Sequence, residues 1–338
     1  MSLLEVPIID VSPWFAGGAS GKARVAELVN QACEDIGFFV IIGHGVDTRI
    51  PERVFDVSRR FFDLPATEKL IVKQWADDIP RGFSPVAAEA VSYSRLKKTP
   101  GDLKESFSVG PLEVPPDDYS RQPGARQLLA ENRWPANPPE FEAIYADYYR
   151  TMERLGAAIM RIFAMALALP ENFFDRAIDR HTSVLRVINY PDQPEAPQAG
   201  QLRAGEHSDY GTFTILRHER QHRPGGLQVF NRAGNWIDVP AIADSFIINI
   251  GDLMARWSND RYVSTMHRVV NPPRERALDS RRMSIVFFHQ TNYNSIIECL
   301  PSCCAADNPA RYPAVAFHDY LRTKFLRQVT FDRPAEAP

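Results

Sequence analysis

The sequence is short of cysteine and of long apolar runs. It has four cysteines in 338 residues, and the segment CLPSCC lacks the paired spacing of a structural zinc site. Free thiols in a reducing compartment are therefore expected. No stretch approaches the roughly 20 apolar residues that cross a bilayer, and the start of the chain has no basic and apolar leader pattern. We expect a cytoplasmic protein with no membrane partner.

The sequence also has no surplus of positive charge. Its 39 basic residues are outnumbered by 42 acidic ones, which gives a formal net charge of −3. Nucleic-acid binders usually carry a basic face, so no nucleic-acid partner is expected. With 44% hydrophobic residues, the chain has the composition of a globular protein with a large core. This composition does not predict an oligomeric state.

The first 140 residues have a mixed α/β pattern. Apolar residues recur at helical spacing over residues 22–36, and Gly37 is expected to end that helix because glycine readily adopts the left-handed cap. Apolar runs at residues 6–11 and 38–43 predict strands. Residues 76–140 are rich in proline and glycine, which predicts long loops of the kind that often line substrate sites.

The rest of the chain divides into three further segments. Residues 141–180 hold one long helical pattern, from Phe141 to Leu169, which predicts a bracing helix. Residues 181–295 hold many short apolar runs separated by turn residues, which predicts a jelly-roll core. Residues 296–338 predict a C-terminal helical segment. The expected fold class is mainly β with flanking helices: a jelly-roll core, or double-stranded β-helix, with an N-terminal α/β region and a long bracing helix.

Three residues of this predicted core form a candidate metal site. His207 and Asp209 are two positions apart in HSDYGTFTIL, so they share a face if the segment is extended. His267 begins a later predicted strand and supplies a third ligand. Two histidines and one carboxylate form the facial triad of non-haem Fe(II) oxygenases, which leaves positions open for O2 and a co-substrate. A zinc site and an incidental surface pair are the alternatives.

A candidate carboxylate clamp lies in RRMSIVFF. Arg282 and Ser284 share a face of the predicted strand, and a guanidinium fork beside a hydroxyl suits a carboxylate. Tyr190, in INYP, could add a phenol. The alternative is a solvent-facing strand, where arginine and serine are common.

These motifs together resemble a known family. HSDYG, NIGDLMARWSNDRYVSTMHRV and RMSIVFF are similar to the isopenicillin N synthase-like branch of 2-oxoglutarate-dependent dioxygenases. VPIIDVS and GFFVIIGHGV resemble the N-terminal domain of that family, and RGFSPVAAEAVSYS and DLKESFSVGP resemble its middle segment. The resemblance therefore covers nearly the whole chain.

The resemblance implies a role for each candidate residue. His207, Asp209 and His267 would bind Fe(II). The distal carboxylate of 2-oxoglutarate would be held by Arg282 and Ser284 with help from Tyr190, and the keto-acid end by Asn189. His267 and Arg282 are 15 positions apart, which is longer than usual for the family. This spacing leaves open whether Arg281 or Arg282 points inward, although alternation with Ser284 favours Arg282.

The implied reaction uses O2 and 2-oxoglutarate, releases succinate and CO2, and hydroxylates, desaturates or cyclises a small-molecule substrate. One alternative is an iron oxidase of the isopenicillin N synthase type, in which the clamp holds a carboxylate of the substrate and 2-oxoglutarate is not used. A second is a non-catalytic small-molecule binder on the same fold. A zinc hydrolase is disfavoured because the chain lacks a His-Glu-x-x-His motif.

The sequence does not identify the substrate. The walls of its pocket are expected to come from the middle loops, where the candidate contacts are Phe83, Tyr93, Arg95 and Phe107.

Overall fold

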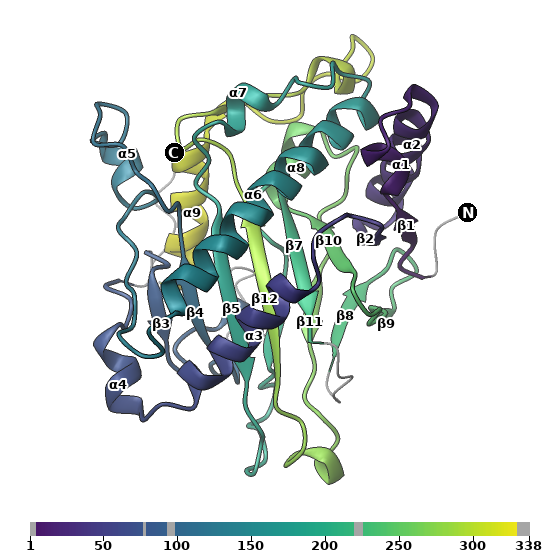
Figure 1. Ribbon diagram of the computed structural model, residues 1–338. Coiled ribbons are helices and arrows are strands. Elements are labelled where there is room, and N and C mark those ends of the chain that lie inside the picture. Colours follow the sequence, from purple (N-terminus) through teal and green to yellow (C-terminus); the bar gives the residue numbers. More distant parts are fainter. Residues whose placement is uncertain (1–4, 77–78, 93–98, 220–225, 330–338) are drawn as a thin grey trace.

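Two large β-sheets with helices around them form the centre of the structure, a computed structural model described over residues 5–76, 79–92, 99–219 and 226–329 (Figure 1). In spatial order the eight-stranded sheet contains β1 (Ile8–Asp10), β2 (Phe38–Ile42), β10 (Phe246–Ile250), β7 (Phe213–His218), β12 (Arg282–His289), β5 (Val184–Tyr190), β4 (Glu105–Val109) and β3 (Gly82–Ser84). The four-stranded sheet contains β6 (Ala204–His207), β11 (His267–Val269), β8 (Leu227–Phe230) and β9 (Trp236–Asp238). The fold class predicted from the sequence is confirmed.

The helices flank these sheets. They are α1 (Ser12–Phe15), α2 (Ala19–Asp35), α3 (Arg49–Phe62), α4 (Ala66–Ile71), α5 (Pro123–Arg126), α6 (Phe141–Ala166), α7 (Asp175–Ile178), α8 (Asp252–Trp257) and α9 (Phe317–Val329). A short pair, β13 (Ile296–Ile297) and β14 (Val315–Ala316), precedes α9. In the part of the chain described here, no helix is long and apolar enough to cross a membrane.

Each face of the large sheet is buried against a different layer. One face packs on α2, α3 and α6 in the larger hydrophobic cluster, and the other packs on the small sheet in a second cluster. This double burial explains why β2 is apolar throughout, and β10 apolar except at Asn249, rather than alternating. The N-terminal segment supplies four strands of this same sheet. The division into four segments therefore describes chain order, and as a division into domains it stays a prediction.

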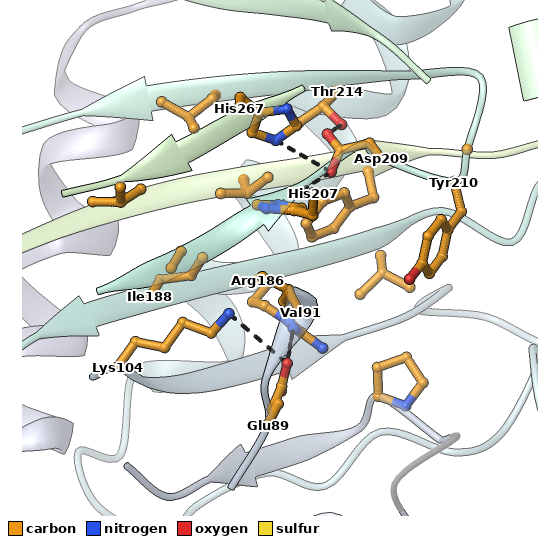
Figure 2. A pocket seen from close by; sticks show the side chains of 18 of the residues that line it. Glu89, Val91, Lys104, Arg186, Ile188, His207, Asp209, Tyr210, Thr214 and His267 are labelled. Carbon is orange, nitrogen blue, oxygen red and sulfur yellow. Dashed lines mark hydrogen bonds and ion pairs between the residues drawn. The ribbon is translucent and has the colours of Figure 1, made fainter. Parts of the chain in front are cut away.

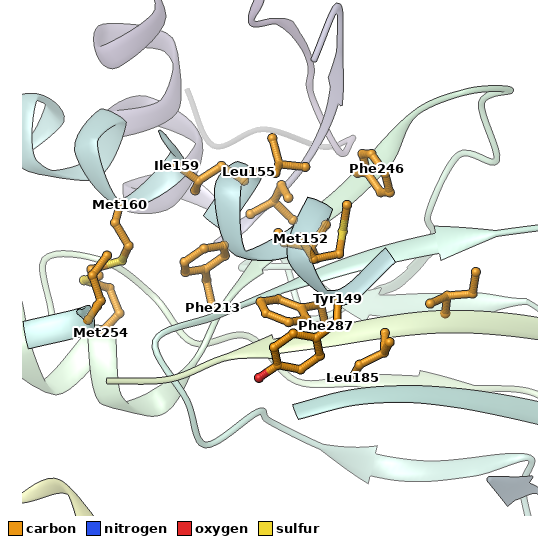
Figure 3. Packing of buried hydrophobic residues seen from close by; sticks show 14 of the residues in the cluster. Tyr149, Met152, Leu155, Ile159, Met160, Leu185, Phe213, Phe246, Met254 and Phe287 are labelled. Carbon is orange, nitrogen blue, oxygen red and sulfur yellow. The ribbon is translucent and has the colours of Figure 1, made fainter. Parts of the chain in front are cut away.

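The predicted bracing helix is α6, which runs for 26 residues across the outer face of the large sheet. Figure 3 shows Met152, Leu155 and Ile159 of this helix lying over side chains of the sheet that include Phe213 and Phe287. Because these apolar residues recur at helical spacing, they form one stripe that faces the sheet. Burial of this stripe fixes the sheet from behind and leaves its other face for the site.

Gly37 ends the preceding helix as predicted. It lies between α2 and β2 with a φ of +67°, and a Cβ atom there would come within 1.9 Å of the carbonyl oxygen of Val263. Only glycine satisfies both conditions. The sharp turn brings β2 directly into the sheet beside β10.

The predicted substrate contacts of Phe83 and Phe107 are wrong. Phe107 is fully buried on the helix side of β4, with its ring centroid 5.1 Å from that of Phe61 and 4.8 Å from that of Phe141. Phe83 packs on Phe61 in the same cluster. Strand alternation turns both rings toward α3 and α6, whereas the neighbouring Ser108 faces the opposite side. Tyr93 and Arg95 lie outside the described residues.

Phe107→Ala is expected to lower the free energy of unfolding by about 3–5 kcal/mol, because it removes a ring from a packed cluster and leaves a cavity. Urea titration followed by fluorescence or circular dichroism would measure this. Phe230→Ala is the matched control, because Phe230 is 39% exposed on β8. If Phe107→Ala lowered the free energy of unfolding no more than Phe230→Ala does, the core position of Phe107 would be contradicted.

Candidate active site

The three predicted metal ligands lie together inside the barrel. β6 and β11 are antiparallel neighbours, and their register places His267 directly opposite His207. The Nε2 atoms of His267 and His207 lie 3.7 Å and 3.9 Å from Oδ1 of Asp209. Figure 2 shows the three side chains pointing toward one another. Among the described residues, this is the one group of three or more such side chains placed to hold an ion.

The remaining polar atoms of the three ligands are occupied by hydrogen bonds that orient them. Nδ1 of His207 lies 2.7 Å from the carbonyl oxygen of Gly205, and Nδ1 of His267 lies 3.1 Å from that of Thr265. A carbonyl oxygen only accepts, so each Nδ1 carries a proton and donates, which leaves each Nε2 turned toward Asp209.

Asp209 is oriented in the same way. Its Oδ2 accepts hydrogen bonds from Oγ1 of Thr214 at 2.5 Å and from Nδ2 of Asn249 at 2.7 Å. Oδ1, the oxygen nearest the two imidazoles, is left to bind metal. Thr214 and Asn249 were missed from the sequence, because only the packing of β7 and β10 brings them to this carboxylate.

Burial and neighbouring charge set the protonation of the group. Burial, and then the adjacent His267, hold the pKa of His207 well below its ordinary value, so its imidazole stays neutral. Burial alone would raise the pKa of Asp209, but the two imidazoles and the two hydrogen bonds outweigh it, so the pKa is lowered. Neutral imidazole and ionised carboxylate are the forms that bind a divalent metal. The donor set therefore fits Fe(II), with the other coordination positions open.

Arg282, Ser284 and Tyr190 lie side by side on the face of β12 and β5 that is turned to the small sheet. Arg282 pairs in register with Tyr190, and its guanidinium carbon is 5.8 Å from the centre of the Tyr190 ring. Nη2 of Arg282 is 2.8 Å from Nδ1 of His218, and the Ser284 hydroxyl is 3.4 Å from the same atom. His218 was missed, although alternation along β7 from Thr214 puts it on this face.

The structure also separates Arg281 from Arg282. Arg281 points to the opposite side, where its Nε donates to Oδ1 of Asn189 at 3.1 Å and its Nη1 lies 2.5 Å from Oδ1 of Asp63. Nδ2 of Asn189 donates to Oε1 of Glu105 at 2.8 Å on that same side. The predicted keto-acid contact of Asn189 is therefore wrong, because alternation along β5 turns its side chain away from Tyr190.

A cavity of about 300 Å³ opens in front of the metal ligands. Most of its wall is apolar, including Ile188, Leu216 and Phe288. Within the described part of the chain, its charged side chains beyond the metal ligands are Glu89, Lys104 and Arg186 (Figure 2). None of these three residues was predicted from the sequence. Arg186 could have been predicted to face the cavity, because strand alternation along β5 places it on the same face as Tyr190.

Comparisons with known proteins agree with this geometry. Residues 6–137 match the family described as non-haem dioxygenase in morphine synthesis N-terminal, and residues 181–291 match the 2OG-Fe(II) oxygenase superfamily. A 2-oxoglutarate-Fe(II) type oxidoreductase of Emericella nidulans, hxnY, is 32% identical over 94% of this chain and 88% of its own length. The chain belongs to the 2-oxoglutarate–Fe(II) oxygenase superfamily.

Further relatives of this oxygenase are similar over most of their length. Validamycin A dioxygenase of Streptomyces hygroscopicus subsp. limoneus is 30% identical, with 96% of this chain and 87% of that protein covered. The crystal structure of a full-length Neurospora crassa protein in complex with alpha-KG and thymine has a TM-score of 0.80 at 30% identity and covers 95% of this chain and 96% of that one. The resemblance to the isopenicillin N synthase-like family is confirmed, and the protein is a non-haem iron dioxygenase that uses Fe(II), 2-oxoglutarate and O2.

Asn249→Ala is expected to weaken Fe(II) binding by about 10- to 100-fold, because Asp209 loses a hydrogen bond that orients its carboxylate. Anaerobic titration with Fe(II) would measure the affinity. Asn235→Ala, at an exposed position after β8, is the control and should bind Fe(II) as the unaltered protein does. Equal affinities in the two variants would rule out an orienting role for Asn249.

Proposed function

We propose that this oxygenase hydroxylates a C–H bond of a small polar metabolite while 2-oxoglutarate is converted to succinate and CO2. The observation that carries the proposal is the His–Asp–His group facing a small, largely apolar cavity, with the Arg282, Ser284 and Tyr190 group at its side. Bound iron and keto acid supply the oxidising chemistry. The protein supplies binding, orientation and exclusion of water.

The metal would be held by His207, Asp209 and His267. The distal carboxylate of 2-oxoglutarate would accept hydrogen bonds from the fork of Arg282 and from the hydroxyl of Ser284, and Tyr190 would flank it. Burial lowers the pKa of Arg282, which means that the buried guanidinium lacks full solvation. A carboxylate bound beside this guanidinium would accept its hydrogen bonds, and this supports a diacid as the ligand.

Known relatives support a small substrate. One is named for validamycin A, and the Neurospora crassa protein has been crystallised with thymine. Desaturation or ring closure would use the same residues, and the mass of the product separates these outcomes from hydroxylation. An oxidase that does not use 2-oxoglutarate would place a carboxylate of the substrate on Arg282 instead.

Arg282→Lys is expected to weaken 2-oxoglutarate binding about 10- to 100-fold, because a lysine ammonium cannot make the two parallel hydrogen bonds of a guanidinium. The affinity would be measured anaerobically on the Fe(II)-loaded protein. Arg281→Lys is the matched control, since Arg281 faces away from this group. If both variants kept full affinity for 2-oxoglutarate, Arg282 would not hold its carboxylate.

Turnover of the iron-loaded protein with candidate metabolites tests the reaction itself. We expect one metabolite to stimulate succinate release, with one atom of ¹⁸O2 in succinate and a second in a product 16 mass units heavier than the substrate in unlabelled O2. Mass spectrometry would detect both. Failure of the iron-loaded protein to bind 2-oxoglutarate would defeat the proposal.

A further inference from the structure

Three charged side chains of the cavity wall lie outside the candidate metal ligands and the Arg282, Ser284 and Tyr190 group. Glu89 follows β3, Lys104 precedes β4, and Arg186 lies on β5 four residues before Tyr190. In Figure 2 these three side chains lie across the pocket from His207, Asp209 and His267. A charge in a largely apolar cavity is costly unless a partner or a ligand compensates it.

Lys104 already has carboxylate partners, because its Nζ lies 4.0 Å from Oε2 of Glu89 and closer still to Asp102 (Figure 2). Its Nζ lies 3.0 Å from Oδ2 of Asp102, which is 1% exposed. Asp102 also accepts hydrogen bonds from the backbone N–H groups of Val91 at 3.2 Å and Gly205 at 3.0 Å. The Lys104–Asp102 pair therefore ties the loop that carries Glu89 to the strand that carries His207.

The Arg186–Glu89 pair is looser. Both carboxylate oxygens of Glu89 contact the same atom, Nη1 of Arg186, at 3.3 Å, whereas a well-formed fork makes two separate bonds of about 2.7–2.9 Å. Nε of Arg186 donates to the hydroxyl of Ser108 at 2.9 Å, which fixes the guanidinium plane. Nη2 makes no hydrogen bond to a described residue. Nη2 of Arg186 is therefore a donor next to the acceptor oxygens of Glu89. The side chain of Arg186 is 16% exposed and that of Glu89 is 27% exposed.

Among the described residues of this wall, the charges cancel. Arg186 and Lys104 balance Glu89 and Asp102, and burial of Glu89 is outweighed by the two nearby cations, which lower its pKa and keep it ionised. A charged substrate would leave an uncompensated charge in the cavity. A neutral substrate with a donor next to an acceptor would complete the hydrogen bonds of the pair and disturb no charge.

We propose that Glu89 and Arg186 form the substrate-recognition subsite and bind the N–H and C=O of a small cyclic amide or imide. In an open-chain secondary amide the trans peptide geometry directs N–H and C=O to opposite sides, whereas a ring holds them on one edge. The N–H would donate to Glu89, and the C=O would accept from Nη2 of Arg186. The ring would lie against apolar residues such as Ile188 and Phe288 in a cavity of about 300 Å³, at the lower end for small-molecule sites.

This inference rests on the proposed function, and six-membered ring probes test it. Calorimetric titration of the anaerobic Fe(II)- and 2-oxoglutarate-loaded protein would compare 2-piperidone with δ-valerolactone, in which oxygen replaces N–H, and with L-pipecolate, a zwitterion of the same ring size. We expect 2-piperidone to bind about 10- to 100-fold more tightly than either comparison compound, because only it donates to Glu89 and adds no charge.

Two variants test separately which residue binds the N–H and which binds the C=O of the amide. Glu89→Gln should weaken binding of 2-piperidone about tenfold and leave the lactone unchanged, because only the lactam donates to this position. Arg186→Lys should weaken both compounds, since both present a C=O. Glu113→Gln is the matched control, because that carboxylate is 84% exposed outside the cavity. Thermal melts would confirm that each variant is folded.

The subsite would be overturned if 2-piperidone bound no more tightly than δ-valerolactone, or if L-pipecolate bound more tightly than 2-piperidone. It would also be overturned if Glu89→Gln weakened the lactam and the lactone equally, or if 2-piperidone did not bind at tens of millimolar. Binding of 2-oxoglutarate, measured on the same samples, separates the two proposals. Its loss defeats the proposed function, whereas intact binding without lactam preference defeats the subsite alone.

Discussion

The antiparallel pairing of β6 with β11 is the constraint on which the site depends. It places His267 opposite His207, and the turn after β6 returns Asp209 to the same point. A slip of one residue in this register would direct one imidazole to the other face of the sheet. Hydrogen bonds from Thr214 and Asn249, which lie on two strands of the large sheet, then fix the carboxylate. The metal centre therefore requires both sheets to be in place.

Strand alternation in the large sheet turns some side chains toward the hydrophobic core and their neighbours toward the cavity. Along β5, Leu185 and Val187 face α6 and the core, whereas Arg186, Ile188 and Tyr190 face the cavity. The same rule puts Phe107 in the core while Ser108, next to it, contacts Arg186. Residues one position apart therefore stabilise the fold or contact ligands, and the helices behind the sheet hold the face that carries the site.

The charges of the cavity are organised in three places. The metal ligands present one ionised carboxylate and a neutral His207 imidazole, Arg282 presents a buried cation beside Tyr190, and the opposite wall carries two balanced pairs. On the two proposals made above, these arrangements would bind a divalent cation, a diacid and a neutral polar molecule, because each would compensate a different charge in a low-dielectric interior. The separation of these charges would keep the three ligands in different places.

The sequence by itself determined the fold class, the long helix α6 and the end of α2 at Gly37, because periodicity and turn chemistry are local properties of the chain. It also indicated the three candidate metal ligands, although Asp209 lies in the turn after β6 and not on a strand with His207. Arg282, rather than Arg281, also follows from alternation with Ser284. Only the tertiary structure decided the partners of each face. Phe83, Phe107 and Asn189 turn away from the cavity, and Glu89 meets Arg186 across 97 positions of sequence. Local sequence patterns predict which residues share a face of a strand. The layer that packs on that face depends on the order of the strands in the sheet, which is set only when distant segments of the chain pair.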